Sequence, residues 1–126
     1  MSKKIAFTED QNNAVNAKGG TLFVSAAAGS GKTAVLTERV KRLLSDENES
    51  ISPDELLVVT YTRAAAAEMR EKIADALRLE VSQTGNKRLK KQLLLLPCAD
   101  ICTIDSFCAK LVRENFHLAD VMPDFR

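Results

Sequence analysis

The stretch TLFVSAAAGSGKT, from Thr21 to Thr33, joins a short apolar run to a row of small residues that ends in Gly-Lys-Thr. The β-branched and aromatic residues of Thr21–Ser25 predict a buried parallel strand, and the residues from Lys32 to about Leu44 predict a helix. A glycine-rich turn between a strand and a helix is the setting of a phosphate-binding loop. The stretch therefore predicts a strand–loop–helix unit that binds a nucleotide.

Strand and helix signals alternate on both sides of this unit. A capping box at Thr8–Gln11 predicts a helix to about Ala17. Apolar runs predict strands at Leu56–Thr60 and Asp100–Ile104. Further helices are predicted over Ala64 to about Leu79, Lys87–Leu96, and Asp105 to about Phe116. This order indicates an α/β fold, with a parallel sheet covered by helices on both faces. Three strands are few for such a sheet, so we expect a truncated, incomplete domain.

Composition narrows the class of protein. With 126 residues the chain has room for one core, and its formal charge of +1 carries no global signature of polyanion binding. No run of about 18 apolar residues predicts a membrane span, so we expect a soluble, cytoplasmic chain with no membrane partner. The cysteines at 98, 102 and 108 are odd in number and match no common metal pattern, which predicts buried, reduced thiols.

The loop Ala26–Thr33 carries the clearest chemical prediction. Small residues allow backbone N–H groups to approach phosphate oxygens, and the following helix adds its partial positive charge. Lys32 is predicted to reach the β- and γ-phosphates of ATP, and the Thr33 hydroxyl to ligate Mg²⁺. Alanine stands at position 26, where the general pattern has its first glycine. The alternative is an ordinary turn between a strand and a helix.

Four segments resemble motifs of the UvrD/Rep group of superfamily 1 DNA helicases. AAAGSGKT at Ala26–Thr33 is similar to the alanine-first form of the phosphate loop, and FTEDQ at Phe7–Gln11 to the group's Q motif. VVTYTRAAAAEM at Val58–Met69 resembles motif Ia, and TIDSFC at Thr103–Cys108 resembles motif Ib, with aspartate where histidine is usual. The AAAAEM run, the TIDSFC region and the closing PDFR most resemble the AddA type within the AddAB helicase–nucleases.

The resemblance implies a RecA-like P-loop NTPase fold, with residues 1–126 forming the N-terminal part of the first motor domain. It implies a DNA helicase and exonuclease that unwinds duplex DNA in double-strand break repair with an AddB-type partner. It places Gln11 at the adenine edge and Arg39 near the nucleotide. The implied nucleotide set is Gln11, Ala26, Ala27, Ala28, Gly29, Ser30, Gly31, Lys32, Thr33 and Arg39, with Lys32 and Thr33 catalytic. The implied track for single-stranded DNA is Thr60, Thr62, Arg63, Thr103, Ser106 and Phe107.

The catalytic set is incomplete in the sequence. Phosphoryl transfer also needs a carboxylate for Mg²⁺ and usually an arginine at the γ-phosphate. Asp54–Glu55 precedes a strand instead of following one, which is the wrong placement. We therefore expect this segment alone to bind ATP weakly and to hydrolyse almost none. The alternatives are a generic P-loop NTPase or small-molecule phosphotransferase, and a folding or interaction unit.

Several residues also have simpler structural interpretations. Gln11 could serve only as a helix cap, and Asp105 could cap the helix that follows the third strand. Tyr61 and Phe107 could be core aromatic residues. The basic cluster Lys87, Arg88, Lys90 and Lys91 is more typical of a solvated helix face than of a DNA contact.

Overall fold

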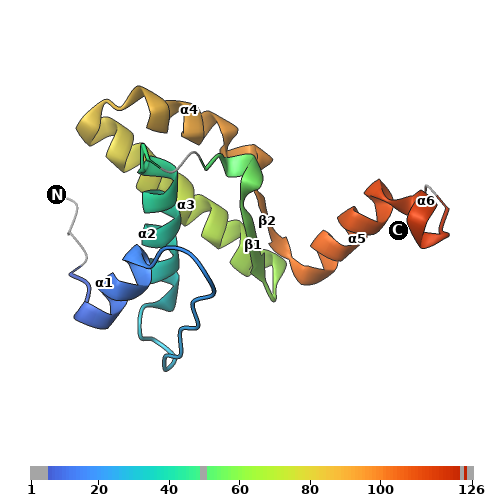
Figure 1. Cartoon of the computed structure of the whole chain (residues 1–126), viewed down its shortest axis with the longest axis horizontal. Helices are drawn as coiled ribbons and strands as arrows, with labels where there is room; N and C mark the ends of the chain where they lie inside the picture. Colours follow the sequence, from blue (N-terminus) through green and yellow to red (C-terminus); the bar gives the residue numbers. More distant parts are fainter. Residues whose placement is uncertain (1–5, 49–50, 123, 125–126) are drawn as a thin grey trace.

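The computed structural model describes residues 6–48, 51–122 and 124 (Figure 1). Most of the described chain is helical, and a small sheet lies near its middle. The elements in chain order are α1 (Glu9–Asn16), α2 (Lys32–Ser45), the 3-10 turn η1 (Pro53–Glu55), β1 (Leu57–Thr60), α3 (Arg63–Thr84), α4 (Lys87–Leu95), the 3-10 turn η2 (Leu96–Cys98), β2 (Asp100–Thr103), α5 (Ile104–Glu114) and α6 (Phe116–Ala119).

The sheet has two parallel strands, with Leu57 opposite Asp100 and Thr60 opposite Thr103. The connection between them carries α3 and α4, as a parallel crossover requires. Two of the predicted strands and the α/β class are thereby confirmed. The prediction of helices on both faces is wrong for the described residues. Val58 and Ile101 are buried beneath α3, whereas Leu57 and Val59, which point to the opposite face, remain exposed.

The predicted strand Thr21–Ser25 is also wrong. These residues are irregular and exposed, and the Phe23 side chain is 88% accessible to solvent. A β-branched or aromatic run becomes a strand only when a neighbouring strand supplies backbone hydrogen bonds and a packing surface. Within the described ranges, β1 and β2 pair with each other alone, so this run has no ladder to join.

Helix α3 is the centre of the packing. It contacts α2, α4 and both strands, and its Ile73 and Leu77 are completely buried. It runs five residues beyond the predicted end at Leu79, because its terminator is Gly85, which takes the left-handed conformation that glycine adopts without strain (φ +64°). A smaller apolar cluster of Ala14, Val15 and Val35 joins α1 to α2.

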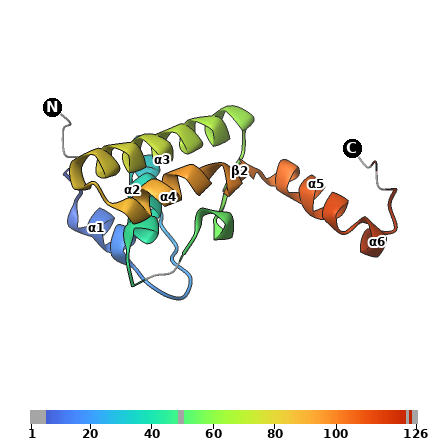
Figure 2. The same ribbon diagram turned by 90° about the horizontal axis from the view of Figure 1, so that it is seen from above.

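Helices α5 and α6 project away from the helical body, as both views show (Figures 1 and 2). Neither contains a buried residue. The ion pair of Lys110 Nζ with Asp100 Oδ1, at 2.7 Å, connects α5 to β2, and this partner raises the pKa of Lys110 above its ordinary value. None of the described helices has the length and hydrophobicity of a bilayer-spanning segment.

The three cysteines are free thiols, but the prediction that they are buried is wrong. Cys98 and Cys108 are exposed and Cys102 is half-buried. Cys108 lies on α5, a helix in which no residue is buried. In the closing PDFR motif, residues 123, 125 and 126 lie outside the described residues.

Candidate nucleotide site

The loop Ala26–Thr33 turns sharply into α2. The Ser30 N–H donates to the Ala27 carbonyl at 3.2 Å, and Gly31 forms the N-terminal cap of α2. Gly29 and Gly31 have φ values of +76° and +83°, a region that residues with a Cβ rarely adopt. Nothing lies within 4 Å of the position that a Gly29 Cβ would take, so the backbone is open to an approaching ligand.

The two predicted catalytic side chains lie at the mouth of this loop. Lys32 and Thr33 form the first turn of α2 and are both exposed. The Lys32 ammonium donates to the Ala26 carbonyl at 3.1 Å, so it lies across the loop from its last to its first residue. No hydrogen bond joins the Thr33 hydroxyl to another described residue, which leaves this oxygen available. The helix N-terminus, the open backbone and the lysine together favour an anionic ligand.

Gln11 connects α1 to the loop. Its Oε1 accepts the Thr8 N–H at 2.9 Å, which closes the predicted capping box. Its Nε2 donates to the Ser30 carbonyl at 2.9 Å, across 19 residues of sequence. The capping interpretation of Gln11 is therefore confirmed, but capping is only one of its contacts.

The residues present fit a nucleotide phosphate but not a complete metal site. The Ser30 Oγ is buried without a hydrogen-bond partner, which is costly unless a ligand or water satisfies it. Among the described residues, no group of three histidine, cysteine or carboxylate side chains could hold a metal ion. Glu55 instead caps η1, since its Oε2 accepts the Ser52 N–H at 2.8 Å.

Arg39 lies about 10 Å along α2 from Lys32, given the rise of 1.5 Å per residue of an α-helix. Its Nη1 donates to the Ala14 carbonyl at 2.6 Å, where it holds the end of α1 against α2. In this arrangement Arg39 supports the packing of α1 on α2, and its predicted place beside the nucleotide stays a prediction.

The six residues of the predicted DNA track gather at one end of the sheet. The strand register sets Thr60 beside Thr103, and α3 and α5 begin within three residues of them. Several hydroxyls of this set are already engaged. Thr62 caps α3 by accepting the Ala65 N–H at 3.1 Å, and the buried Thr103 donates to the Ser106 Oγ at 2.8 Å. Arg63 is exposed and Phe107 half-buried.

Tyr61 is the residue at this edge that the sequence interpretation missed. Its side chain is 99% exposed between β1 and α3, so the core interpretation of Tyr61 is wrong. The alternation of side chains along a strand could have indicated this exposure. Val58 points inward, so Leu57 and every second residue after it, Tyr61 included, point outward. An unburied aromatic ring beside exposed Arg63 is a surface on which a nucleic-acid base can stack.

Local contacts decide the structural interpretation of Asp105. Asp105 does not cap α5, because Thr103 does so by accepting the Ser106 N–H at 3.2 Å. Asp105 instead lies exposed in the first turn, where its charge suits the helix dipole. In the basic cluster of α4, Lys87, Lys90 and Lys91 are exposed, as expected of a solvated face.

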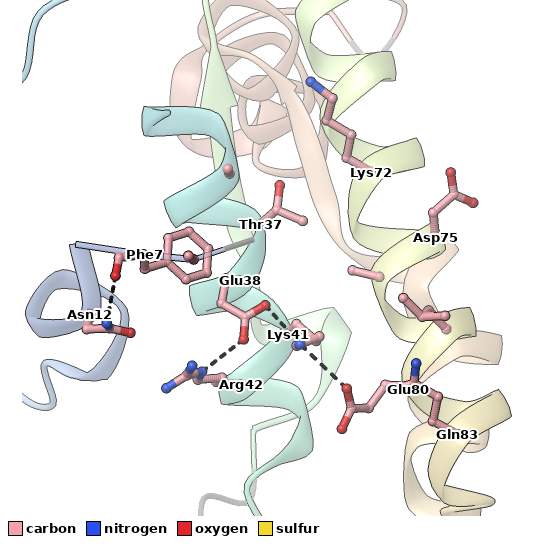
Figure 3. A pocket seen from close by; sticks show the side chains of 14 residues that line it. Phe7, Asn12, Thr37, Glu38, Lys41, Arg42, Lys72, Asp75, Glu80 and Gln83 are labelled. Atoms are coloured by element: carbon pink, nitrogen blue, oxygen red, sulfur yellow. Dashed lines mark hydrogen bonds and ion pairs between the residues drawn. The ribbon is translucent and has the colours of Figure 1, made fainter. Parts of the chain in front are cut away.

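A cavity of about 880 Å³ lies between α2 and α3, beside Phe7 and Asn12 (Figure 3). Lys41 on α2 pairs with Glu38 of the same helix at 2.8 Å and with Glu80 of α3, across the cavity, at 3.5 Å. No residue of the loop lines this cavity. The loop residues predicted to hold the nucleotide therefore lie outside this cavity.

Comparison with known proteins identifies the family of this chain. Residues 7–126 match the family model described as the UvrD/REP helicase N-terminal domain. The chain is 54% identical over 121 residues to an ATP-dependent helicase/nuclease subunit of Thermoanaerobacter sp. (strain X514), and the match covers 95% of this chain and 10% of that protein. It is 47% identical over 124 residues to the protein of the same name from Clostridium acetobutylicum, a match that covers 98% of this chain and 10% of the relative.

The chain thus spans about a tenth of the length of these relatives. The family match begins at Phe7 and includes the loop, the capping box and both strands. The chain therefore belongs to the UvrD/REP helicase N-terminal domain family.

Proposed function

We propose that residues 1–126 form the ATP-binding, N-terminal part of the first RecA-like motor domain of an ATP-dependent DNA helicase and nuclease. The observation that carries the proposal is the Ala26–Thr33 loop. Its two glycines with positive φ keep the backbone open, while Lys32 and Thr33 stand at its mouth. Family membership supports the same assignment.

In the bound state, the N–H groups of Gly29, Ser30 and Gly31 and the start of α2 hold the phosphates of ATP. The Lys32 ammonium, which donates to the Ala26 carbonyl in this structure, would hold the β- and γ-phosphates, and the Thr33 hydroxyl would be a ligand of Mg²⁺. When bound, Mg²⁺ would neutralise part of the negative charge of the phosphates. The described residues hold no group of three potential metal ligands, and we expect the segment alone to bind ATP weakly and to hydrolyse almost none.

The edge where both strands end is proposed as a track for single-stranded DNA. Tyr61 offers a stacking surface, Arg63 a charge for phosphate, and Phe107 a second ring. Thr62 and Thr103 cap the helices that begin at this edge. Thr60 and Ser106 hydrogen-bond to these caps, and their hydroxyls belong to the proposed track. None of these contacts depends on base identity, which suits a motor that moves along any sequence.

The relatives' name describes one subunit of a larger assembly, so we propose that the parent protein assembles with a second, AddB-type partner. We propose that this complex acts on DNA ends during double-strand break repair in the cytoplasm. The names of the two relatives support the helicase and nuclease activities proposed for the whole protein.

Calorimetric titration of the chain with Mg²⁺ and a non-hydrolysable ATP analogue tests the nucleotide proposal. We expect Lys32→Ala to weaken binding by about tenfold or more, since a charged hydrogen bond to phosphate contributes about 1.5–3 kcal/mol. Lys91→Ala, at an exposed lysine on α4, is the matched control and should bind as the unaltered chain does. Equal affinities of the Lys32→Ala and unaltered chains, or no binding by the folded unaltered chain, contradict the proposal.

A further inference from the structure

Both polar atoms of the Gln11 amide are engaged by the protein. Oε1 accepts the Thr8 N–H and Nε2 donates to the Ser30 carbonyl, each at 2.9 Å. A side chain that only recognised the adenine edge would leave these atoms free to exchange hydrogen bonds with the base. Gln11 instead joins the N-terminus of α1 to the middle of the loop.

The contact with Ser30 sets the direction of a second group. In a trans peptide unit the C=O and the following N–H point to opposite sides. The Ser30 carbonyl points toward Gln11, so the N–H of Gly31 points to the side of the loop away from Gln11. A backbone N–H directed in this way can donate to an anion on that side.

The neighbouring residues permit this arrangement. A Cβ on Gly31 would lie 3.4 Å from the Gln11 Nε2, at the close limit of ordinary van der Waals contact, and Gly31 also has a φ of +83°. The Ser30 hydroxyl is buried and unpartnered, so Gln11 holds Ser30 by its carbonyl and not by its side chain.

We propose that Gln11 is a positioning residue for the loop, and that its Nε2 holds the Ser30 carbonyl so that the Gly31 N–H faces the bound phosphate. This inference rests on the proposed nucleotide binding. Its consequence is a contribution to phosphate affinity that does not depend on the base, because the contact acts on the loop backbone.

The test compares binding of a non-hydrolysable ATP analogue, the corresponding GTP analogue and inorganic tripolyphosphate, each with Mg²⁺, to the unaltered chain and to Gln11→Met. Methionine has similar length and no charge, so it removes the amide contacts without adding repulsion. We expect all three ligands to bind Gln11→Met about tenfold more weakly than the unaltered chain. The reason is that the Ser30 carbonyl loses its hydrogen-bond donor, so the Gly31 N–H is no longer held toward the phosphate.

Thr8→Val is the control for helix capping. It removes the Oγ1 that accepts the Gln11 N–H at 3.3 Å, but it leaves the Gln11 contact with Ser30 in place. We expect tripolyphosphate to bind this variant within about twofold of the unaltered chain, since the phosphate-facing loop is unchanged. An equal loss of affinity in Thr8→Val and Gln11→Met overturns the proposal, because the effect then comes from α1 alone.

The base comparison separates positioning from base recognition. Weakening confined to the adenine analogue, or no weakening with any ligand, overturns the inference while nucleotide binding stands. Failure of the unaltered chain to bind tripolyphosphate and both analogues overturns the proposed function together with the inference.

If Gln11→Met does not fold, NMR of the unaltered chain tests whether the Gln11 contact with Ser30 persists when phosphate is bound. Slow exchange of the Gln11 side-chain amide in the presence of tripolyphosphate supports the inference, and loss of that protection overturns it.

Discussion

Thr60 and Thr103 lie opposite each other at the last pair of the parallel sheet, and each stands at or just before the start of a helix. Thr103 caps α5 directly, while the Thr60 Oγ1 donates to the carbonyl of Thr62, the cap of α3, at 3.0 Å. The two helices therefore begin at the same edge of the sheet, and this common edge is where the exposed Tyr61 and Arg63 emerge.

Replacing Thr103 by valine should lower the free energy of unfolding by about 1–2 kcal/mol, the usual cost of losing an N-cap. The side chain is buried, and it bonds both the N–H and the hydroxyl of Ser106, so both contacts are lost. Urea denaturation measures the change. Thr21→Val, at an exposed and irregular position, should stay within about 0.5 kcal/mol of the unaltered chain. Equal stabilities of the two variants contradict the capping role.

Truncation of Leu77 to alanine should destabilise the fold by about 2–5 kcal/mol, because this completely buried side chain leaves a cavity among α2, α3 and α4. Leu94 provides the matched control, since its side chain is 74% exposed. Thermal unfolding of Leu94→Ala should differ little from that of the unaltered chain. A similar loss in both variants shows that α3 is not the centre of the core.

Tyr61→Ala should weaken binding of single-stranded DNA by about 1–3 kcal/mol, the range measured for stacking of one base on an aromatic ring. Fluorescence anisotropy with a labelled oligothymidine measures this loss. Tyr61→Phe keeps the ring and should bind nearly as well as the unaltered chain. Stability should hardly change in either variant, because the side chain is almost fully exposed. Unchanged DNA affinity in Tyr61→Ala argues against a track at this edge.

The contact of Lys110 with Asp100 predicts a pH dependence for α5. The pKa of Lys110 is raised above its ordinary 10.5 chiefly by the hydrogen bond that it donates to Asp100. The stabilisation is therefore fully present below pH 10.5 and is lost as the pH rises through the higher, folded pKa. Backbone amide shifts of α5 should move in this alkaline range. Lys110→Met should abolish that movement, and its persistence in the variant would assign the transition to another group.

Much of the secondary structure could be predicted from local signals. The capping box at Thr8–Gln11, the alanine-rich composition of α3 and the Gly85 terminator act through neighbours a few residues apart, so sequence patterns report them directly. Strands β1 and β2 could be predicted because short apolar runs mark them and each found a partner. The loop Ala26–Thr33 was likewise evident, because its small residues and its Gly-Lys-Thr ending are local features.

By itself, the sequence determined most of the helices, two strands, the position of the loop and the family, since all of these depend on short-range patterns. Only the tertiary structure decided that Thr21–Ser25 is not a strand, that Tyr61 is exposed and that Gln11 holds Ser30. The physical reason is distance along the chain. Strand pairing, burial and the Gln11–Ser30 hydrogen bond depend on which distant segments meet, and no local propensity contains that information.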